Sequence, residues 1–110
     1  DLAEATVRSG AAIVESAPSG AGHLLGVLVS LLDGPRELAV VGPDAGELAA
    51  LAWERYRPGL AVAQSQIVGE DVVPLLEGRG RPRETLAYLC RRFVCDAPFN
   101  SEEALRLALE

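Results

Sequence analysis

The chain has 110 residues, 49% of them hydrophobic and 24% charged, which is the composition of one small folded domain rather than a disordered segment. Its net charge of −6 argues against a nucleic-acid partner, because proteins that bind nucleic acid neutralise phosphates with a surplus of basic side chains. No apolar run reaches the roughly 18 residues that cross a bilayer, so we expect no membrane partner. The chain begins at Asp1 without a basic leader or an initiator methionine. We interpret it as a piece of a longer protein and expect that protein to be cytoplasmic.

Residues 1–34 are predicted to form an αα-hairpin. Apolar residues recur at near-helical spacing over residues 2–16, and Pro18 interrupts the pattern because it lacks an N–H group and clashes with the preceding turn. A second helix with a broad apolar face follows, and a turn at Asp33-Gly34-Pro35 ends it. That face consists of Leu24, Leu25, Leu28, Leu31 and Leu32. It is wider than the first helix can cover, which predicts that another part of a larger protein packs against it.

Residues 35–110 are predicted to form a small α/β domain. The run 37–42 is short, apolar and bounded by prolines, which is typical of a buried strand in a parallel sheet. Asp44 is placed to cap a helix that runs to about Arg57, because its carboxylate can accept hydrogen bonds from free backbone N–H groups. A second strand over residues 60–63 completes a βαβ unit.

The remaining segments predict a third strand and a final helix. Residues 64–84 are expected to be irregular, with a short helical turn near residues 72–76. The third strand is expected over residues 85–90, and Ser101 caps the last helix, whose first turn is acidic. The fold class is therefore α/β, with a mainly parallel three-stranded sheet of order 2-1-3 and flanking helices.

No complete catalytic constellation is visible, so we predict no catalytic residue and no cofactor. The turn at residues 41–46 follows a strand and opens a helix, where α/β proteins bind phosphates, but it lacks both glycine-rich spacings and Asp44 repels an anion. A ligand at this strand end remains a third functional hypothesis. His23 is the sole histidine, and we interpret it as a capping or packing residue.

Cys90 and Cys95 are the only two cysteines. Five extended residue steps span about 16 Å, so a disulfide requires a sharp turn between them, which the end of the third strand near Cys90 allows. We favour two reduced, partly buried structural thiols. A disulfide or redox-responsive pair is the first alternative, because Arg91 and Arg92 would stabilise a neighbouring thiolate. A metal site is the second, although only His23 and carboxylates could complete the ligand set, and we predict no metal.

Five of the ten basic residues, all of which are arginines, lie close together in the sequence near the cysteines, with only Glu84 to offset them. They are either a solvated loop cluster or a contact for an anion or an acidic partner. The five are Arg79, Arg81, Arg83, Arg91 and Arg92.

The segment 87–98, AYLCRRFVCDAP, resembles the "AYVCRNFxCxxP" ending of a family of thioredoxin-domain proteins of unknown function that includes spermatogenesis-associated members. Three earlier matches come in the same order, at residues 40–42, 56–58 and 74–78. Both cysteines fit the pattern, whereas Arg92 stands in place of the usual asparagine. The resemblance covers residues 36–98 clearly and the earlier residues only by position and helical pattern.

The resemblance implies a long parent protein with an N-terminal thioredoxin-like domain, a central α/α toroid and a small C-terminal α/β region. Residues 1–34 would then be the end of the toroid, and residues 35–110 the C-terminal domain. We expect a non-catalytic structural or interaction domain whose partner is the toroid of its own chain and which self-associates when alone. The alternative is a redox- or metal-responsive module that uses Cys90 and Cys95.

Overall fold

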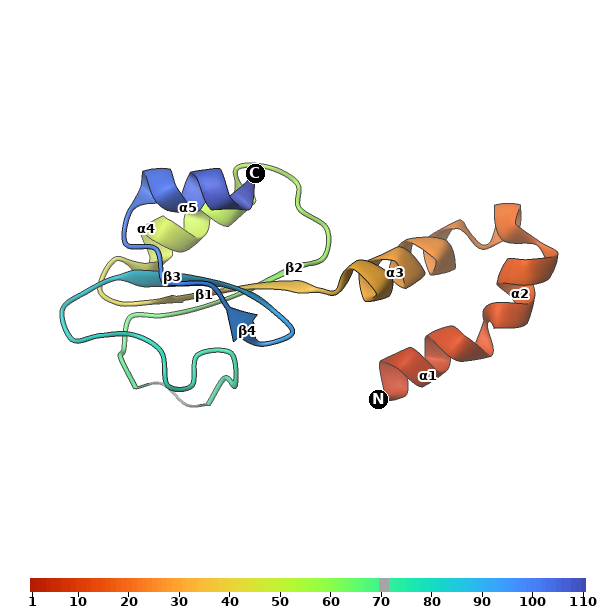
Figure 1. The fold of residues 1–110 in the computed structure, drawn as a ribbon, viewed down its shortest axis with the longest axis horizontal. Coiled ribbons are helices and arrows are strands. Elements are labelled where there is room, and N and C mark those ends of the chain that lie inside the picture. Colours follow the sequence, from red (N-terminus) through yellow and green to blue (C-terminus); the bar gives the residue numbers. More distant parts are fainter. Residues whose placement is uncertain (70–71) are drawn as a thin grey trace. The chain divides into compact units, whose positions relative to one another are not determined.

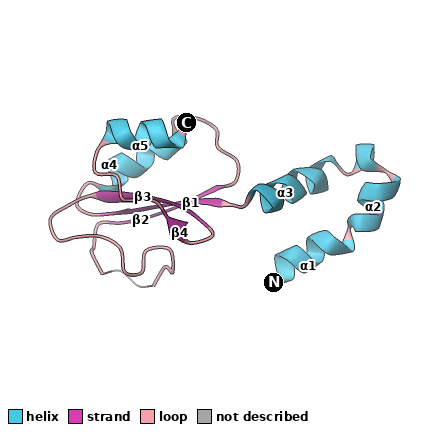
Figure 2. Ribbon diagram, in the orientation of Figure 1, coloured by secondary structure: helices cyan, strands magenta, loops and turns pink. Residues whose placement is uncertain are grey.

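The computed structural model describes residues 1–69 and 72–110 (Figure 1). The chain forms two compact units, Asp1–Gly34 and Pro35–Glu110. The first unit is helical, and the second contains a sheet and helices (Figure 2). The expectation of a mixed α/β chain is therefore confirmed at this level. Residues 70 and 71 of the segment predicted to be irregular lie outside the described residues.

The helix predicted over residues 2–16 is divided at Gly10 into α1 (Leu2–Ser9) and α2 (Ala11–Ser16). A Cβ atom on Gly10 would overlap the side chain of Leu24 in the next helix. The break thus occurs at the residue whose missing side chain allows this close approach. The helical spacing of apolar residues does not reveal the break at Gly10, because that spacing continues from α1 into α2.

The helix α3 (Gly22–Asp33) follows a 3₁₀ turn at Pro18–Gly20, and Gly34 is its C-cap, within the turn that the sequence predicts at residues 33–35. No residue of α1, α2 or α3 is buried. Val29 and Leu32 are 56% and 74% exposed. The helical unit therefore has almost no core of its own.

The sheet of the second unit has four strands in the order β2-β1-β3-β4. Their bounds are Arg36–Val41 for β1, Leu60–Ser65 for β2, Leu86–Arg91 for β3 and Val94–Cys95 for β4. β1 is parallel to β2 and antiparallel to β3, which is antiparallel to β4. The neighbours of β1 are those predicted, but the expectation of a mainly parallel three-stranded sheet is wrong.

The direction of β3 follows from the connection that precedes it. A parallel β3 would require a crossover back to the start of β1, which takes a connection of about a dozen or more residues that usually contains a helix. The described part of the segment 66–84 forms bends and turns, including hydrogen bonds from the N–H of Leu76 to Val73 and of Glu77 to Pro74. Since the described part of this connection contains no helix to carry the chain back, the chain enters β3 at the end of the sheet where it left β2.

The helices α4 (Ala45–Ala50) and α5 (Glu102–Leu109) cover one face of the sheet (Figure 1). The buried side chains on this face include Leu38, Val40, Leu48, Ala87, Leu89, Leu105 and Leu109. The aromatic residues Trp53 and Tyr56 are exposed and take no part in this core. The buried residues on the helix-covered side of the sheet are therefore all aliphatic, and the partly buried Phe99 packs against them.

The connection between β2 and β3 covers the opposite face. Leu75 and Leu76 of this connection pack with Ala39 and Val41 of β1 and with Cys90 of β3. Because β1 is covered on both faces, every one of its residues after Arg36 is buried. This explains why the strand appears in the sequence as a continuous run rather than as an alternating pattern.

The helix after β1 is shorter than predicted, and Arg57 binds carbonyl groups of the turn that follows it. α4 ends at Ala50 and continues as a 3₁₀ turn over Leu51–Trp53. Arg57 Nη1 donates to the carbonyl oxygens of Leu51 at 3.4 Å and Ala52 at 3.1 Å. These bonds satisfy groups that a helix end leaves without intrahelical partners.

Arginines also hold the carboxyl end of α5. Arg36 Nη2 donates to Ala108 O and Arg57 Nε donates to Leu109 O, both at 3.3 Å. Positive charge is favourable there because the helix dipole is negative at its C-terminus. Arg106 forms a two-point ion pair with Glu54, with N–O distances of 2.8 and 3.1 Å. The hydrogen bond from Arg106 lowers the pKa of the Glu54 carboxyl, and the positive charges of Arg106, Arg57 and Arg55 lower it further.

The Glu54–Arg106 pair is expected to contribute to stability only where Glu54 is ionised. Because the folded-state pKa is lowered, the contribution is fully present above the ordinary glutamate pKa of about 4.3 and is lost as the pH falls through the folded value. A double-mutant cycle with Glu54→Gln and Arg106→Gln, followed by urea unfolding from pH 7 to pH 3, measures this. The coupling should disappear at the acid end; a coupling that stays constant over the whole range would contradict the assignment.

Gly42 fixes the contact between the end of β1 and the start of β3. Its φ is 138°, and a Cβ atom there would overlap Glu84 O and Thr85 Cα, which belong to the backbone. Backbone cannot move aside as a flexible side chain can. Gly46 in α4 is a natural comparison, because the nearest atom to a Cβ there is Gln64 Oε1 at 3.8 Å.

Gly42→Ala is expected to destabilise the second unit by about 3 kcal/mol or more, through overlap with backbone and an unfavourable φ. Gly46→Ala is expected to stabilise it by about 0.5–1 kcal/mol, because alanine is the better helix former. Urea unfolding of both variants measures the difference. Equal effects of the two substitutions would show that the Gly42 contact is not tight.

Candidate functional site

The two cysteines lie on a short hairpin formed by β3 and β4. Arg91 pairs with Val94, so the turn between the strands consists of Arg92 and Phe93. Both have positive φ, 51° for Arg92 and 63° for Phe93. Two-residue hairpin turns that need this conformation usually contain asparagine or glycine, because other side chains are strained in it. Other contacts must therefore hold the turn.

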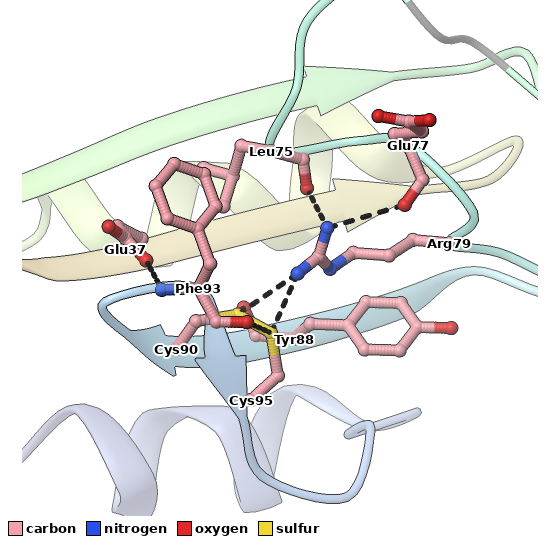
Figure 3. The surroundings of a disulfide bond; sticks show 8 residues. All are labelled: Glu37, Leu75, Glu77, Arg79, Tyr88, Cys90, Phe93 and Cys95. Atoms are coloured by element: carbon pink, nitrogen blue, oxygen red, sulfur yellow. Dashed lines mark hydrogen bonds between the residues drawn. A yellow bond between two sulfur atoms is a disulfide. The ribbon is translucent and has the colours of Figure 1, made fainter.

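One of these contacts comes from Glu37 in β1. Its side chain is largely buried, and its Oε2 accepts a hydrogen bond from the backbone N–H of Phe93 at 2.8 Å (Figure 3). Glu37 lies opposite Cys90 in the β1–β3 register, which brings the carboxylate next to the hairpin. The central strand thus supplies an acceptor for a turn N–H group that follows it by more than fifty residues.

The second contact is covalent. Cys90 and Cys95 face each other across the β3–β4 pair and are joined by a disulfide with an S–S distance of 2.06 Å. The bond replaces the reduced pair that we favoured from the sequence. The sharp turn that a disulfide requires lies between β3 and β4, at the end of the third strand where the sequence allowed it, and the antiparallel β4 places the two cysteines opposite each other. Cys90 is only 3% exposed, whereas Cys95 is half-buried.

Arg79 reaches the disulfide from the connection that covers this face of the sheet (Figure 3). Its Nη2 lies 2.9 Å from Cys95 Sγ and 3.8 Å from Cys90 Sγ. Its Nη1 donates to the carbonyl oxygens of Leu75 and Glu77, and the guanidinium lies 5.8 Å from the ring centre of Tyr88. The Tyr88 hydroxyl in turn accepts from the N–H of Gly80 at 3.1 Å. The guanidinium is therefore held in place from several sides.

The five arginines grouped by the sequence have different surroundings. Arg79 is half-buried against the sulfurs, whereas the other four are exposed. Arg81 forms an exposed ion pair with Glu84 at 3.9 Å, and Arg83 has a positive φ of 66°. We assigned the thiolate-stabilising role to Arg91 and Arg92, but the guanidinium that contacts the sulfurs is that of Arg79. Sequence proximity missed it because the fold of residues 72–80 creates the contact.

Neither of the other candidates forms a similar constellation. His23 is exposed at the start of α3. Asp44 precedes α4 but makes no side-chain capping bond; instead its backbone N–H donates to Thr85 Oγ1 at 3.0 Å. The nearby cavity of about 180 Å³ is lined by Asp44, Glu47, Leu48, Thr85, Asn100 and Glu102. Three carboxylates make that cavity unsuitable for a phosphate.

Over residues 1–69 and 72–110, no group of three or more histidine, cysteine or acidic side chains is arranged to hold a metal ion. Over the same ranges, no helix has the length and apolar character to cross a bilayer. No protein-family model, curated protein or solved structure matches this chain. Function must therefore be argued from the hairpin and from the uncovered helices.

Replacing Glu37 should loosen the hairpin without changing the rest of the sheet. In Glu37→Leu the Phe93 N–H loses its acceptor, whereas Glu37→Gln keeps an oxygen at the same position. Hydrogen exchange at Phe93 is therefore expected to accelerate about tenfold in the leucine variant and to change little in the glutamine variant. Unchanged exchange at Phe93 in Glu37→Leu would show that the carboxylate does not hold the turn.

Proposed function

We propose that this chain is a non-catalytic structural and interaction domain, and that its helical unit docks onto another part of a larger parent protein. The observation that carries the proposal is the lack of a core in residues 1–34. Ala21 and Gly34 are the only buried residues in that range, all of which the structure describes. The partner proposed from the sequence resemblance is the α/α toroid of the same chain, and the location proposed is the cytoplasm.

The energetics support a missing partner for α3. Ordering a residue costs about 1–2 kcal/mol in backbone entropy, and a helical unit recovers this mainly by burying apolar side chains. The leucines of α3 are at best half-buried, and Val29 and Leu32 are mostly exposed. Burying such a side chain fully stabilises a fold by about 1.5–3 kcal/mol. Protein packed over α3 would supply the stabilisation that the unit does not provide for itself.

The isolated chain is expected to self-associate through this apolar surface and to bind a dye that reports exposed apolar groups. The double variant Val29→Glu/Leu32→Glu should reduce both effects, because it places charge on the surface. Leu107→Glu is the matched control, since Leu107 is 69% exposed but lies on α5 in the other unit. Sedimentation and dye fluorescence are measured over a range of protein concentrations. A wild-type monomer that binds no dye at high concentration would refute the proposal.

A second candidate function is favoured by the disulfide and by Arg79. In this function the β3–β4 hairpin responds to redox conditions, with Cys90 and Cys95 as the reacting pair. The half-buried Cys95 is within hydrogen-bonding distance of a fixed cation, which is the environment that makes a cysteine reactive. A metal-responsive version first requires reduction, since the two sulfurs are bonded to each other.

A further inference from the structure

The two sulfurs of the hairpin differ in access to an external reagent. Cys90 is 3% exposed and packs with Val41, Leu75 and Leu76, whereas Cys95 is half-buried on the short strand β4. A thiolate that attacks a disulfide must approach one of the sulfurs directly. The exposure of the pair therefore favours attack at Cys95 Sγ and departure of Cys90 Sγ.

Arg79 interacts differently with the two redox states. In the disulfide the sulfurs are neutral, and a hydrogen bond from a guanidinium to them is weak. After reduction a thiolate at either position would be a charged acceptor, and hydrogen bonds between charged groups are roughly twice as strong as neutral ones. Nη2 is already 2.9 Å from Cys95 Sγ and 3.8 Å from Cys90 Sγ. The guanidinium therefore stabilises the reduced thiolates more than the disulfide.

We propose that Cys90–Cys95 is a reversible thiol–disulfide exchange site in which external thiols attack Cys95 and Arg79 stabilises the thiolates that form. This inference rests on the second candidate function, and it adds which sulfur is attacked and which side chain stabilises the thiolates. The substrate class is a thiol reductant, RSH, that reacts as its thiolate.

The exchange takes place in two displacements. First, RS⁻ attacks Cys95 Sγ, the bond between the two cysteine sulfurs breaks, and Cys90 leaves as a thiolate that keeps the bonding electron pair. Then a second RS⁻ attacks the R-group sulfur of the mixed disulfide and releases Cys95 as a thiolate together with RSSR. Two RS⁻ are oxidised to one RSSR, and the protein disulfide gains the two electrons.

Reduction also has a structural consequence. The turn residues Arg92 and Phe93 both have the strained positive φ, and β4 has only two residues, one of which is Cys95. After the S–S bond breaks, the two-residue backbone pairing of β3 with β4 remains. The hydrogen bond from Phe93 N–H to Glu37 Oε2 and the hydrogen bond from Asp96 N to Leu89 O support it. The hairpin is therefore expected to open more easily in the reduced protein.

The test compares Arg79→Gln with wild type, with Arg79→Lys as the conservative variant and Arg81→Gln as the matched control. Each protein is equilibrated with mixtures of reduced and oxidised glutathione, and thiols are trapped and counted by mass spectrometry. Circular dichroism confirms that each variant is folded. Arg79→Gln should require an about tenfold more reducing thiol–disulfide ratio, the lower end of what a hydrogen bond to a charged group contributes. The reduced pair should also react about tenfold more slowly with iodoacetamide at neutral pH.

Three outcomes would each contradict one part of the proposal: the redox function, the role of Arg79, or the attack at Cys95. If glutathione and dithiothreitol leave the folded wild-type disulfide intact, the redox function itself is wrong. If the wild type is reduced but Arg79→Gln and Arg81→Gln behave alike, the role of Arg79 is wrong while the redox function stands. If peptide mapping of the trapped intermediate finds glutathione on Cys90, the assignment of Cys95 as the attacked sulfur is overturned. Glutathione on Cys95, with a tenfold effect in Arg79→Gln that is smaller in Arg79→Lys and absent in Arg81→Gln, supports all three parts.

Discussion

The burial of β1 on both faces is the constraint on which the second unit depends. α4 and α5 lie against one face, and the connection between β2 and β3 lies against the other (Figure 1). A central strand covered in this way requires both layers, because uncovering either one exposes half of its side chains to water. The described part of the second layer consists of bends and turns rather than a helix, and it carries Leu75, Leu76 and Arg79 to the two cysteines. The same segment thus covers one face of β1 and forms the surroundings of the disulfide.

The parts of the fold that the sequence predicts are those with a local signal. β1 and its parallel partner β2 follow from apolar runs bounded by proline and glycine, and α5 follows from Ser101, whose Oγ accepts from the N–H of Ala104 at 3.3 Å. The direction of β3 has no such signal. The apolar pattern of residues 86–91 predicts a strand, but it does not show whether that strand is parallel or antiparallel to β1. β4 has two residues and no periodicity, and its turn contains neither glycine nor asparagine.

The candidate site could be predicted in part. The two cysteines stand out because there are no others, and the turn between them decides whether they can bond. Arg79 could be assigned to a basic cluster but not distinguished within it, because its contact with Cys95 depends on how residues 72–80 fold. Glu37 gave no signal beyond being a charged residue at the start of an apolar run. Its role depends on the β1–β3 register, which places it opposite Cys90.

Because β4 has only two residues, its pairing with β3 depends in part on the disulfide and therefore on whether the surroundings are reducing or oxidising. β3 is paired on its outer side at two places, by Phe99 opposite Ala87 and by β4 beyond Leu89. Only the second pairing contains the covalent bond. In reducing surroundings the thiols stay unbonded and the hairpin is expected to open more easily. An opened hairpin leaves the outer side of β3 beyond Leu89 with unpaired N–H and C=O groups, the kind of backbone to which another strand can be added. In oxidising surroundings the disulfide keeps β4 paired with β3 and so protects this part of the sheet edge from strand addition.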